Sequence, residues 1–518
     1  MRIRPAKNKR RKESFQAERV TDTEADIQLP TSLQRSRCLL QETWSNCDDF
    51  QWHPVVIQNV SAAVVFVRGL VNVDLLETGI MAPLTRFADK KVSTENLITT
   101  LTAIPVRTEN RLSTINQAIA DGSVIVLVDG QSQSLVADVS KFPGRSIEPS
   151  QVEPSIQGPQ EAFVENLETN LALIRKRLRT PRLKAQAMRI GQVTRTTVLI
   201  VYIDGIANPK IIDEVQSRLH RIDIDGILDT SFIREMIADH PYSPFRTSEV
   251  TERSDRAAAG LLQGRVVILV DGAPTIILVP VVFIAALASS EDYYNNYIVA
   301  FQVRILRHLT YWASLLLPSL YIALLSYNPD LIPTPLLISL AAQHEGIPFP
   351  TVVEALAMQA AFVALRDAGL RLPKAVGQSV SIVGALVIGD AAVNANLVSP
   401  GMVIVVAAAG VASFTIPSQD LSSTNRLLQF PFMLTASLLG LYGIVTLGLA
   451  LVIHMVSLRS FGVPYMAPIA PFSRGEMRDS FIRAPWWAMS RRPTFYEPMD
   501  IQRNRTPVPG PKAGGDRA

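Results

Sequence analysis

Several polar side chains interrupt the apolar C-terminal half of the chain, at positions where they could serve an ion or proton path. Asp390 is the only formally charged residue among the 41 residues 376–416, and the same stretch also contains Asn394 and Gln378. Glu354 lies upstream, in an amphipathic stretch. A polar group at bilayer depth is costly, so it is expected to face a partner helix or a water-filled path. We therefore predict Asp390, Asn394, Gln378 and Glu354 as functional polar residues of a membrane domain.

Small residues recur every four positions in this stretch, at Ser381, Ala385 and Gly389. Residues four apart share one face of a helix, and small residues on such a face let two membrane helices approach closely. These three residues therefore predict a helix-packing face.

The acidic and cysteine residues of the sequence give little reason to expect catalysis. Asp129, Asp204 and Asp271 each precede a glycine after a strand-like run, which is the usual signature of a turn. Cys38 and Cys47 are too few for a disulfide framework or a metal site. We predict no enzyme activity, no cofactor and no bound metal.

Long apolar runs predict a helical membrane domain. Candidate spans, each near the roughly 20 residues that a crossing needs, cover 305–327, 376–395, 399–416 and 430–458. Residues 336–372 are amphipathic and fit either a re-entrant pair of helices or a fifth span. The arginine-rich tail is predicted to face the cytosol, as is the N-terminal half, which has no signal peptide. Ends on the same side require an even number of spans, which favours four over five.

The first 12 residues hold seven Lys or Arg side chains, and no apolar run follows them. Such an arm suits anionic lipid at a cytosolic membrane surface better than nucleic acid. We therefore predict membrane lipid as a partner and no nucleic acid.

The soluble half contains an internal repeat. Residues 65–77 (VFVRGLVNVDLLE) match residues 201–213 (VYIDGIANPKIID) at an offset of 136, and VIVLVDG at 124–130 matches VVILVDG at 266–272 at an offset of 142. Two motifs in the same order at nearly the same offset indicate a tandem duplication.

These patterns predict an α+β membrane protein: two tandem related cytosolic α/β subdomains followed by a polytopic α-helical membrane domain. The predicted divisions are a disordered basic arm (1–50), a first subdomain (52–140), a linker with an amphipathic helix (141–189), a second subdomain with a membrane-proximal segment (190–300), the membrane domain (301–458) and a basic cytosolic tail (459–518).

Long motifs in the chain resemble the A subunits of bacterial spore germinant receptors, the GerA spore-germination family. The resemblance runs from about residue 55 to 493 and is carried by GPQEAFVENLETNLALIRKRLR (158–179), YIDGIANPKIIDEV (202–215), HPYSPFRTSEVTERSDRAAAGLLQGRVVILVDGAPTIILVP (240–280), SSEDYYNN (289–296), RDAGLRLPKAVGQSVSIVGALVIGDAAVNANLVSP (366–400) and IRAPWWAMSRRP (482–493). Departures from the family pattern are Gln359, where a glutamate is expected, and Asn394 and Asn396, where relatives often carry an acid and a glycine. Asp390 is therefore the acid left in this segment for any acid-dependent ion path.

The resemblance implies a receptor subunit in the inner membrane of the spore, with its N-terminal domain and tail facing the spore core. It implies a transporter-like B subunit that binds the nutrient, a lipoprotein C subunit and a homo-oligomer. In such a receptor, this chain would transduce nutrient binding into ion release and germination, as a nutrient-gated ion channel. Two alternatives stay open: an A-like accessory subunit of the dipicolinate-release channel, and a secondary transporter.

Overall fold

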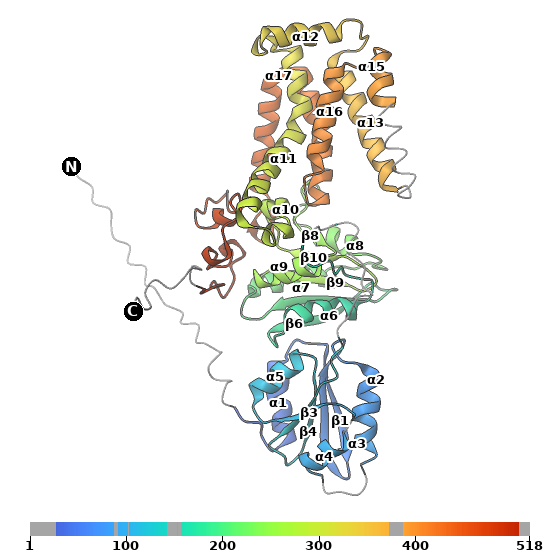
Figure 1. Cartoon of the computed structure of the whole chain (residues 1–518), viewed down its shortest axis with the longest axis vertical. Helices are drawn as coiled ribbons and strands as arrows, with labels where there is room; N and C mark the ends of the chain where they lie inside the picture. Colours follow the sequence, from blue (N-terminus) through green and yellow to red (C-terminus); the bar gives the residue numbers. More distant parts are fainter. Residues whose placement is uncertain are drawn as a thin grey trace, which may run out of the picture. The chain divides into compact units, whose positions relative to one another are not determined.

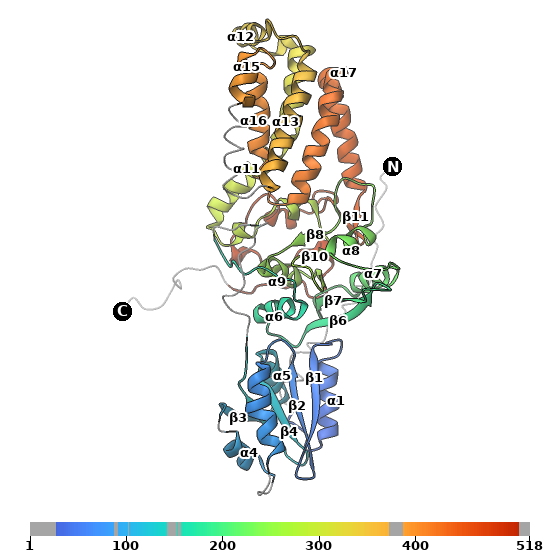
Figure 2. The ribbon, with the colours of Figure 1, turned by 90° about the vertical axis from the view of Figure 1, so that its right-hand side faces the viewer.

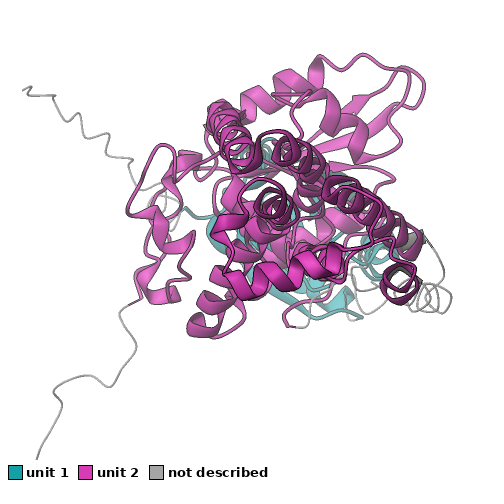
Figure 3. Ribbon diagram, turned by 90° about the horizontal axis from the view of Figure 1, so that it is seen from above, with its two compact units in different colours: residues 1–142, 178–183 teal, residues 143–177, 184–518 magenta. Residues whose placement is uncertain are grey.

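The computed structural model describes residues 27–87, 92–101, 103–141, 153, 157–371 and 387–506. The chain forms two compact units (Figure 3). Unit 1 comprises residues 1–142 and 178–183, and unit 2 comprises residues 143–177 and 184–518. Unit 1 holds one sheet, and unit 2 holds a second sheet, the long helices and the C-terminal segment.

Unit 1 is built on a five-stranded sheet with the order β1-β2-β4-β5-β3, in which every neighbouring pair is antiparallel (Figure 1). Its strands carry β-branched residues that face a buried core, which is what favours a strand over a helix here. In chain order the elements are α1 (Leu33–Thr43), β1 (Phe50–Ile57), β2 (Val60–Val67), α2 (Val73–Leu76), a π-helical turn (Glu77–Met81), α3 (Ala82–Thr85), α4 (Thr94–Thr100), β3 (Val106–Glu109), α5 (Leu112–Ala120), β4 (Val124–Val128) and β5 (Ser134–Ala137).

The second sheet repeats this topology, with the order β6-β7-β9-β10-β8. Helix α5 packs on β2, β4 and β5, and its counterpart α9 packs on the corresponding strands β7, β9 and β10. The elements are α6 (Leu167–Arg177), β6 (Leu183–Ile190), β7 (Thr196–Ile203), α7 (Pro209–His220), α8 (Thr230–Met236), β8 (Glu249–Thr251), α9 (Ser254–Leu262), β9 (Val266–Val270) and β10 (Ile276–Val279). The two sheets share one strand order, which agrees with the tandem duplication that the repeated motifs predict.

The aspartates of the repeated Asp-Gly turns have structural roles. Gly130 and Gly272 have φ values of 83° and 82°, which side chains with a Cβ atom rarely adopt. The backbone N–H of Asp129 donates to Ser61 O at 2.9 Å, and its side chain accepts from the N–H of Leu33 at the start of α1. These contacts give Asp129 a structural role in its turn.

Unit 2 continues into a bundle of helices. Its elements are α10 (Phe283–Leu287), a 3-10 turn (Ser290–Tyr293), α11 (Tyr297–Ser326), a 3-10 turn (Pro329–Leu331), α12 (Thr334–His344), α13 (Thr351–Arg371), a π-helical turn η5 (Val387–Ala391), α15 (Ala392–Asn394), α16 (Pro400–Ser413) and α17 (Gln419–Ser457). Within the described ranges, α11 and α17 are long and apolar enough to cross a membrane, and α16 is a shorter apolar helix. The predicted span 376–395 lies largely outside the described residues.

Helix α17 is a hairpin of two helical arms, 419–439 and 441–457 (Figure 2). Gly440 separates them with the non-helical angles φ 59° and ψ −141°. Thr424 donates to Pro244 O at 2.6 Å, and His454 contacts the hydroxyl of the adjacent Ser243 at 2.9 Å. A straight helix would hold residues 30 positions apart about 45 Å from each other, so the chain must fold back. The prediction of one continuous span over 430–458 was wrong. The chain turns at Gly440, and no charged residue marks this turn in the sequence.

The C-terminal segment folds onto the second sheet, where the sequence indicated only a basic tail. Tyr496, 1% exposed, and Phe461 belong to the same buried core as Val198 and Ile268 of the sheet. The N–H of Met499 donates to Ile206 O at 2.9 Å. Short elements order this segment: β11 (Arg459–Ser460), β12 (Val463–Pro464) and 3-10 turns at Glu476–Asp479, Trp486–Ala488 and Thr494–Tyr496.

We expect Gly440→Ala to destabilise the chain by about 1–3 kcal/mol, because a Cβ atom is strained at this φ and would lie 2.8 Å from Cβ of Tyr327. Thermal unfolding of the detergent-solubilised full chain would measure the loss. Gly448→Ala is the matched control, since a Cβ there meets nothing within 4 Å. Equal midpoints for the two variants would argue against a strained turn at Gly440.

Candidate functional site

The predicted polar residues of the membrane domain do not come together in one site. Asp390 lies in η5 and Asn394 at the end of α15, and both are exposed. A Cβ atom on Gly389 would meet nothing within 4 Å in this chain. The other two members of the predicted packing face, Ser381 and Ala385, lie outside the described residues, as does Gln378. The roles of these residues stay predictions.

Glu354 is the predicted residue that the structure places in a network of contacts. Its side chain, on α13, is 0% exposed. Its Oε1 accepts hydrogen bonds from the backbone N–H and the hydroxyl of Ser399, both at 2.5 Å. Ser399 in turn caps the N-terminus of α16 by accepting from the N–H of Met402 at 3.2 Å. The second carboxyl oxygen, Oε2, lies 3.7 Å from Nδ1 of His344 and has no hydrogen-bond partner among the described residues.

Amide side chains connect three helices in the middle of the bundle. Gln359 donates to Gln429 at 2.5 Å, and Gln429 donates to the carbonyl of Ser314 at 2.6 Å. Asn425 donates to the hydroxyl of the same Ser314. Gln359, which departs from the family pattern, is thus a buried amide paired with another amide rather than a free polar group. This network ties α13, α17 and α11 together.

A second network, in which Asp292 is the central acid, lies where α11 begins. Asp292 is 3% exposed and forms ion pairs with Arg304 at 3.0 Å and Arg307 at 2.9 Å. Arg304 also donates to the carbonyl of Asp479 in the C-terminal segment, at 2.7 Å. Burial alone would raise the pKa of Asp292, but the hydrogen bonds and charges of the two arginines lower it below its usual value. The network fixes α11 to the segment before it and to the C-terminal segment.

A third set of polar contacts, between Arg253, Asp255 and Tyr294, links the second subdomain to the segment before α11. Arg253 forms a two-pronged contact with Asp255, at 3.0 and 2.8 Å, and Asp255 accepts from the hydroxyl of Tyr294 at 2.6 Å. Burial and the Asp255 carboxylate raise the pKa of Tyr294 to about 12, so this hydroxyl keeps its proton. Arg253 also donates to the carbonyl of Pro159 at 3.1 Å.

Glu249, on β8, is the acid with the most strongly shifted pKa where the second subdomain meets the helices. It is 7% exposed and pairs with Arg256 and, at 2.6 Å, with Arg265. Burial would raise its pKa, but the two arginines outweigh burial and lower it to about 2. Asp420, at the start of α17, is held by Arg234 of α8 at 3.0 and 2.5 Å. An acid–arginine contact thus joins the second subdomain directly to α17.

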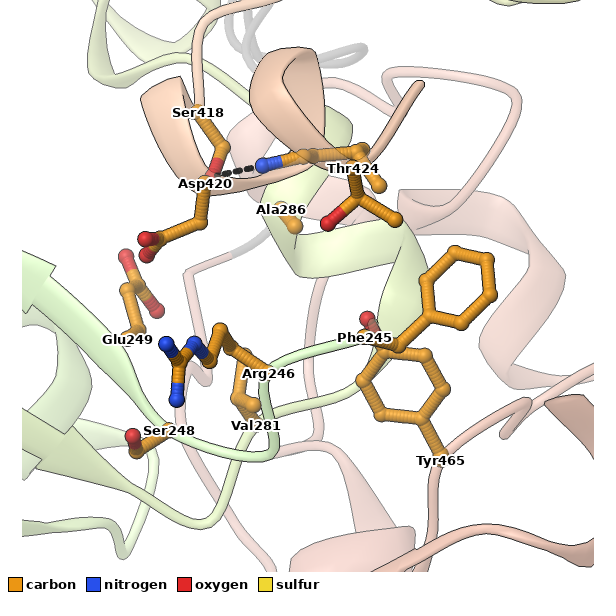
Figure 4. A pocket seen from close by; sticks show the side chains of 11 residues that line it. Phe245, Arg246, Ser248, Glu249, Val281, Ala286, Ser418, Asp420, Thr424 and Tyr465 are labelled. Carbon is orange, nitrogen blue, oxygen red and sulfur yellow. Dashed lines mark hydrogen bonds between the residues drawn. The ribbon is translucent and has the colours of Figure 1, made fainter. Parts of the chain in front are cut away.

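A small cavity that is partly open to solvent lies where the second subdomain meets the start of α17 (Figure 4). In Figure 4 the side chains of Arg246, Ser248 and Glu249 lie on one side of the cavity, and the rings of Phe245 and Tyr465 lie on the other. The lining residues are Phe245, Arg246, Ser248, Glu249, Val281, Ala286, Ser418, Asp420, Leu421, Thr424 and Tyr465. Within the described ranges, no group of three or more His, Cys, Asp or Glu residues could hold a metal ion.

Sequence reasoning assigned no role to Asp292, Asp255 or Glu249. Asp292 could have been found, because it directly precedes a long apolar helix whose Arg304 and Arg307 are three residues apart and so share a face. Glu249 could not have been found in this way, because Arg256 and Arg265 come close to it only in the folded subdomain. Many residues of these networks come from the motifs at 158–179, 240–280, 289–296 and 482–493. Arg234, Arg304, Arg307, Asp420 and Asp479 lie outside those motifs.

Because these pairs keep carboxylates ionised, we expect stability to fall in acid. Glu249 has its folded pKa lowered from 4.5 to about 2, so its stabilisation is complete above pH 4.5 and is lost as the pH falls toward 2. The shift corresponds to about 3 kcal/mol. Denaturation of the solubilised chain at pH 5, 4 and 3 would measure it. Glu249→Gln should flatten this dependence, whereas Glu235→Gln, at an exposed position, should leave it as in the wild type.

The chain matches known proteins over most of its length. The family model described as Bacillus/Clostridium GerA spore germination protein matches residues 39–495. The chain is 42% identical to the membrane protein YfkQ of Bacillus subtilis (strain 168) over 435 residues, covering 84% of this chain and 85% of YfkQ. It is 39% identical to spore germination protein KA of the same organism over 461 residues, covering 88% and 84%.

A solved structure also resembles the chain: the N-terminal domain of the A subunit of the Bacillus megaterium spore germinant receptor GerK3. The alignment covers 50% of this chain and 98% of that domain, with 30% identity and a TM-score of 0.39. The match to the family model spans both sheets, the helical bundle and most of the C-terminal segment. On this breadth of agreement, the chain belongs to the GerA family of spore germination proteins.

Proposed function

We propose that this chain is the membrane A subunit of a spore nutrient germinant receptor. In the proposal, a transporter-like B subunit binds the nutrient, a lipoprotein C subunit completes the receptor, and several copies of this chain form an ion channel that the nutrient gates. Family membership supports the role in germination. The channel, its oligomeric state and its partners go beyond that membership.

The observation that carries the proposal is the direct attachment of the second subdomain to the helices. Asp292 pairs with α11, and Arg234 of α8 pairs with Asp420 of α17. Buried Phe245, Val281 and Phe283 share one core with Tyr311 of α11 and with α17. A rearrangement of this subdomain would therefore shift two helices of the bundle, which is what gating from the soluble side requires.

The C-terminal segment supports a common side for both soluble parts. It shares a core with the second sheet, which supports a topology in which the segments before α11 and after α17 lie on one side of the membrane. The bundle would then cross an even number of times, and the arginine-rich segment favours the cytosolic side, which faces the core in a spore.

Deleting the gene in its host would test the role directly. We expect loss of germination with some nutrients and not with others. Liposomes that contain the assembled receptor should release ions when that nutrient is added. Intact germination without any nutrient-dependent ion flux would remove the channel role.

The accessory subunit of a dipicolinate-release channel is the second candidate, because the resemblance extends to that sister group. It predicts slow dipicolinate release with every nutrient, whereas a receptor subunit predicts a defect with particular nutrients. Genes for B and C subunits beside this gene would favour the receptor. A secondary transporter would instead show substrate uptake by this chain without its partner subunits.

We expect Asp390→Ala to slow germination several-fold while the protein level stays nearly normal. Asp390 is exposed on a helical turn in the bundle, so its loss removes no internal contact that the structure shows, and its role would lie toward a partner copy or a wet path. Optical-density loss of nutrient-treated spores and immunoblots would measure the two quantities. Asp330→Asn, also at an exposed position, is the control. A normal nutrient response would remove Asp390 from the mechanism.

A further inference from the structure

Two arginines at one end of the helical bundle have no carboxylate partner among the described residues. Arg366 lies on α13 and Arg426 on the first arm of α17, and these two helices pack on each other. In the part of the chain that the structure describes, their side chains donate to serine hydroxyls, and neither forms an ion pair. An arginine with no carboxylate beside it is available to a ligand that carries negative charge.

The two guanidinium groups lie on one side of α17. Ser422 and Arg426 are four residues apart, so they share a face of this helix. Nη2 of Arg366 lies 3.5 Å from Oγ of Ser422, which brings Arg366 to the same face, and the charge of Arg426 acts on it. Two like charges placed together disfavour each other, so an anion bound by both arginines would offset their repulsion.

The contacts of Arg366 leave part of its hydrogen-bonding capacity unused. Nη1 lies 3.3 Å from Oγ of Ser413 and Nη2 3.5 Å from Oγ of Ser422, both longer than the roughly 2.7–2.9 Å of a charge-assisted hydrogen bond. Nε is buried and has no partner among the described residues. The C-terminal end of α16 favours a nearby cation, which accounts in part for Arg366. Arg426 lies in the second turn of α17 and gains no such stabilisation.

The acids closest in sequence to these arginines point in other directions. Asp420 pairs with Arg234 of the second subdomain, and Ser422 lies about 160° from it around α17. Asp367 follows Arg366 directly and so lies about 100° away around α13. Residues 400–416, which include α16, contain no Asp or Glu. The described residues therefore give this place net positive charge, which favours an anion.

The surface beside the two arginines is apolar and lies at the edge of the apolar part of the bundle. Val411 and Phe414 of α16 are 66% and 61% exposed, as is Leu427 of α17 at 61%, and the Phe414 ring centroid is 4.8 Å from Cζ of the arginine on α13. Residues 355–365 before the first arginine and 427–458 after the second contain no Asp, Glu, Lys or Arg. Basic side chains at such a boundary meet lipid headgroups, and exposed apolar side chains beside them meet acyl chains.

We propose that Arg366 and Arg426 together bind the phosphate group of an anionic phospholipid, with Val411, Phe414 and Leu427 against its acyl chains. A free phosphate ester shares the phosphate chemistry but lacks the acyl part. The site does not depend on the proposed nutrient response, so its test reads binding rather than germination.

Native mass spectrometry of the full chain in neutral detergent would count bound lipids during titration with phosphatidylglycerol or phosphatidylcholine. We expect tighter binding of phosphatidylglycerol and a roughly tenfold or greater loss of its affinity in Arg426→Gln, because a hydrogen bond to a charged group is lost. Arg366→Gln should lose a similar amount, and Arg426→Lys should keep part of the affinity. Arg459→Gln, at an exposed position directly after α17, removes a single arginine outside the site and should bind as the wild type does.

Two further measurements locate the lipid and identify the source of the phosphate. A photoactivatable phosphatidylglycerol should cross-link the wild-type chain within residues 362–366, 411–414 or 422–427. Inorganic phosphate and glycerol 3-phosphate should compete only weakly, because they lack the acyl part. The proposal is overturned if Arg426→Gln binds phosphatidylglycerol like the wild type, if the cross-links fall elsewhere, or if either free phosphate competes as strongly as the lipid.

Discussion

Asp292→Asn is expected to remove about 3–5 kcal/mol of stability, the cost of leaving a buried charge without its partner. Asp292 pairs with two arginines, of which Arg304 is 1% exposed and Arg307 is 8% exposed. The substitution keeps the size of the side chain but leaves both guanidinium groups with less compensation. Because a domain is stable by only about 5–15 kcal/mol, the level of folded protein in the membrane should fall sharply.

Asp213→Asn makes the same chemical change at an exposed position on α7 and should leave the protein level unchanged. Immunoblots of spore membranes and thermal unfolding of the solubilised chain would compare the two. The C-terminal segment should also become sensitive to protease, since Arg304 holds it through Asp479. Wild-type stability of Asp292→Asn would contradict a structural role for this network.

A double variant tests whether the loss of stability in Asp292→Asn comes from the charge of the arginines that lose their partner. Asp292→Asn combined with Arg307→Gln removes one of the two arginine charges that lose Asp292, so the double variant should be more stable than the sum of the single losses implies. Additive losses would show that the two groups do not depend on each other. This coupling would measure how firmly the segment before α11 is attached to that helix.

The repeated fold was predictable because its signals are local. Gly69 and Gly205 each follow the second strand of a copy and have φ values of 83° and 72°, and only a few residue types tolerate such angles. Asn72 and Asn208 then cap the next helix, each accepting from the N–H two residues later. A turn glycine and a cap asparagine are fixed by backbone geometry, so they stay recognisable when the strands between them diverge.

The hairpin of α17 and the folded C-terminal segment were not predictable in this way. Gly440 lies among apolar residues that suit one long helix as well as two short ones, so hydropathy alone cannot place the turn. Tyr496 is one aromatic residue in a stretch rich in proline and arginine, and its burial depends on a sheet formed almost 300 residues earlier. Glu354 lies in an amphipathic stretch, and its contact with Ser399 forms only when α13 meets α16.

Glu354→Ala is expected to destabilise the bundle strongly. It would leave the backbone N–H and the hydroxyl of Ser399 without their acceptor at a buried position, which costs about 1–3 kcal/mol for each group, and it would also empty the volume of the side chain. Ser399 caps α16, so the start of that helix should loosen. Glu345→Ala, at an exposed position next to His344, is the control and should have little effect.

Glu354→Gln keeps a hydrogen-bond acceptor for Ser399 but replaces the carboxyl group with a neutral amide. Its amide oxygen can still accept from Ser399, and its amide nitrogen would occupy the position of Oε2, 3.7 Å from Nδ1 of His344, where it could donate to that nitrogen. Because a neutral amide costs less to bury than a carboxylate, the folded level of this variant should stay close to that of the wild type. A slow nutrient response in such a folded variant would then report a functional role of the Glu354 carboxyl group, whereas equal loss of folded protein in the Gln and Ala variants would show that this carboxyl group is required for folding.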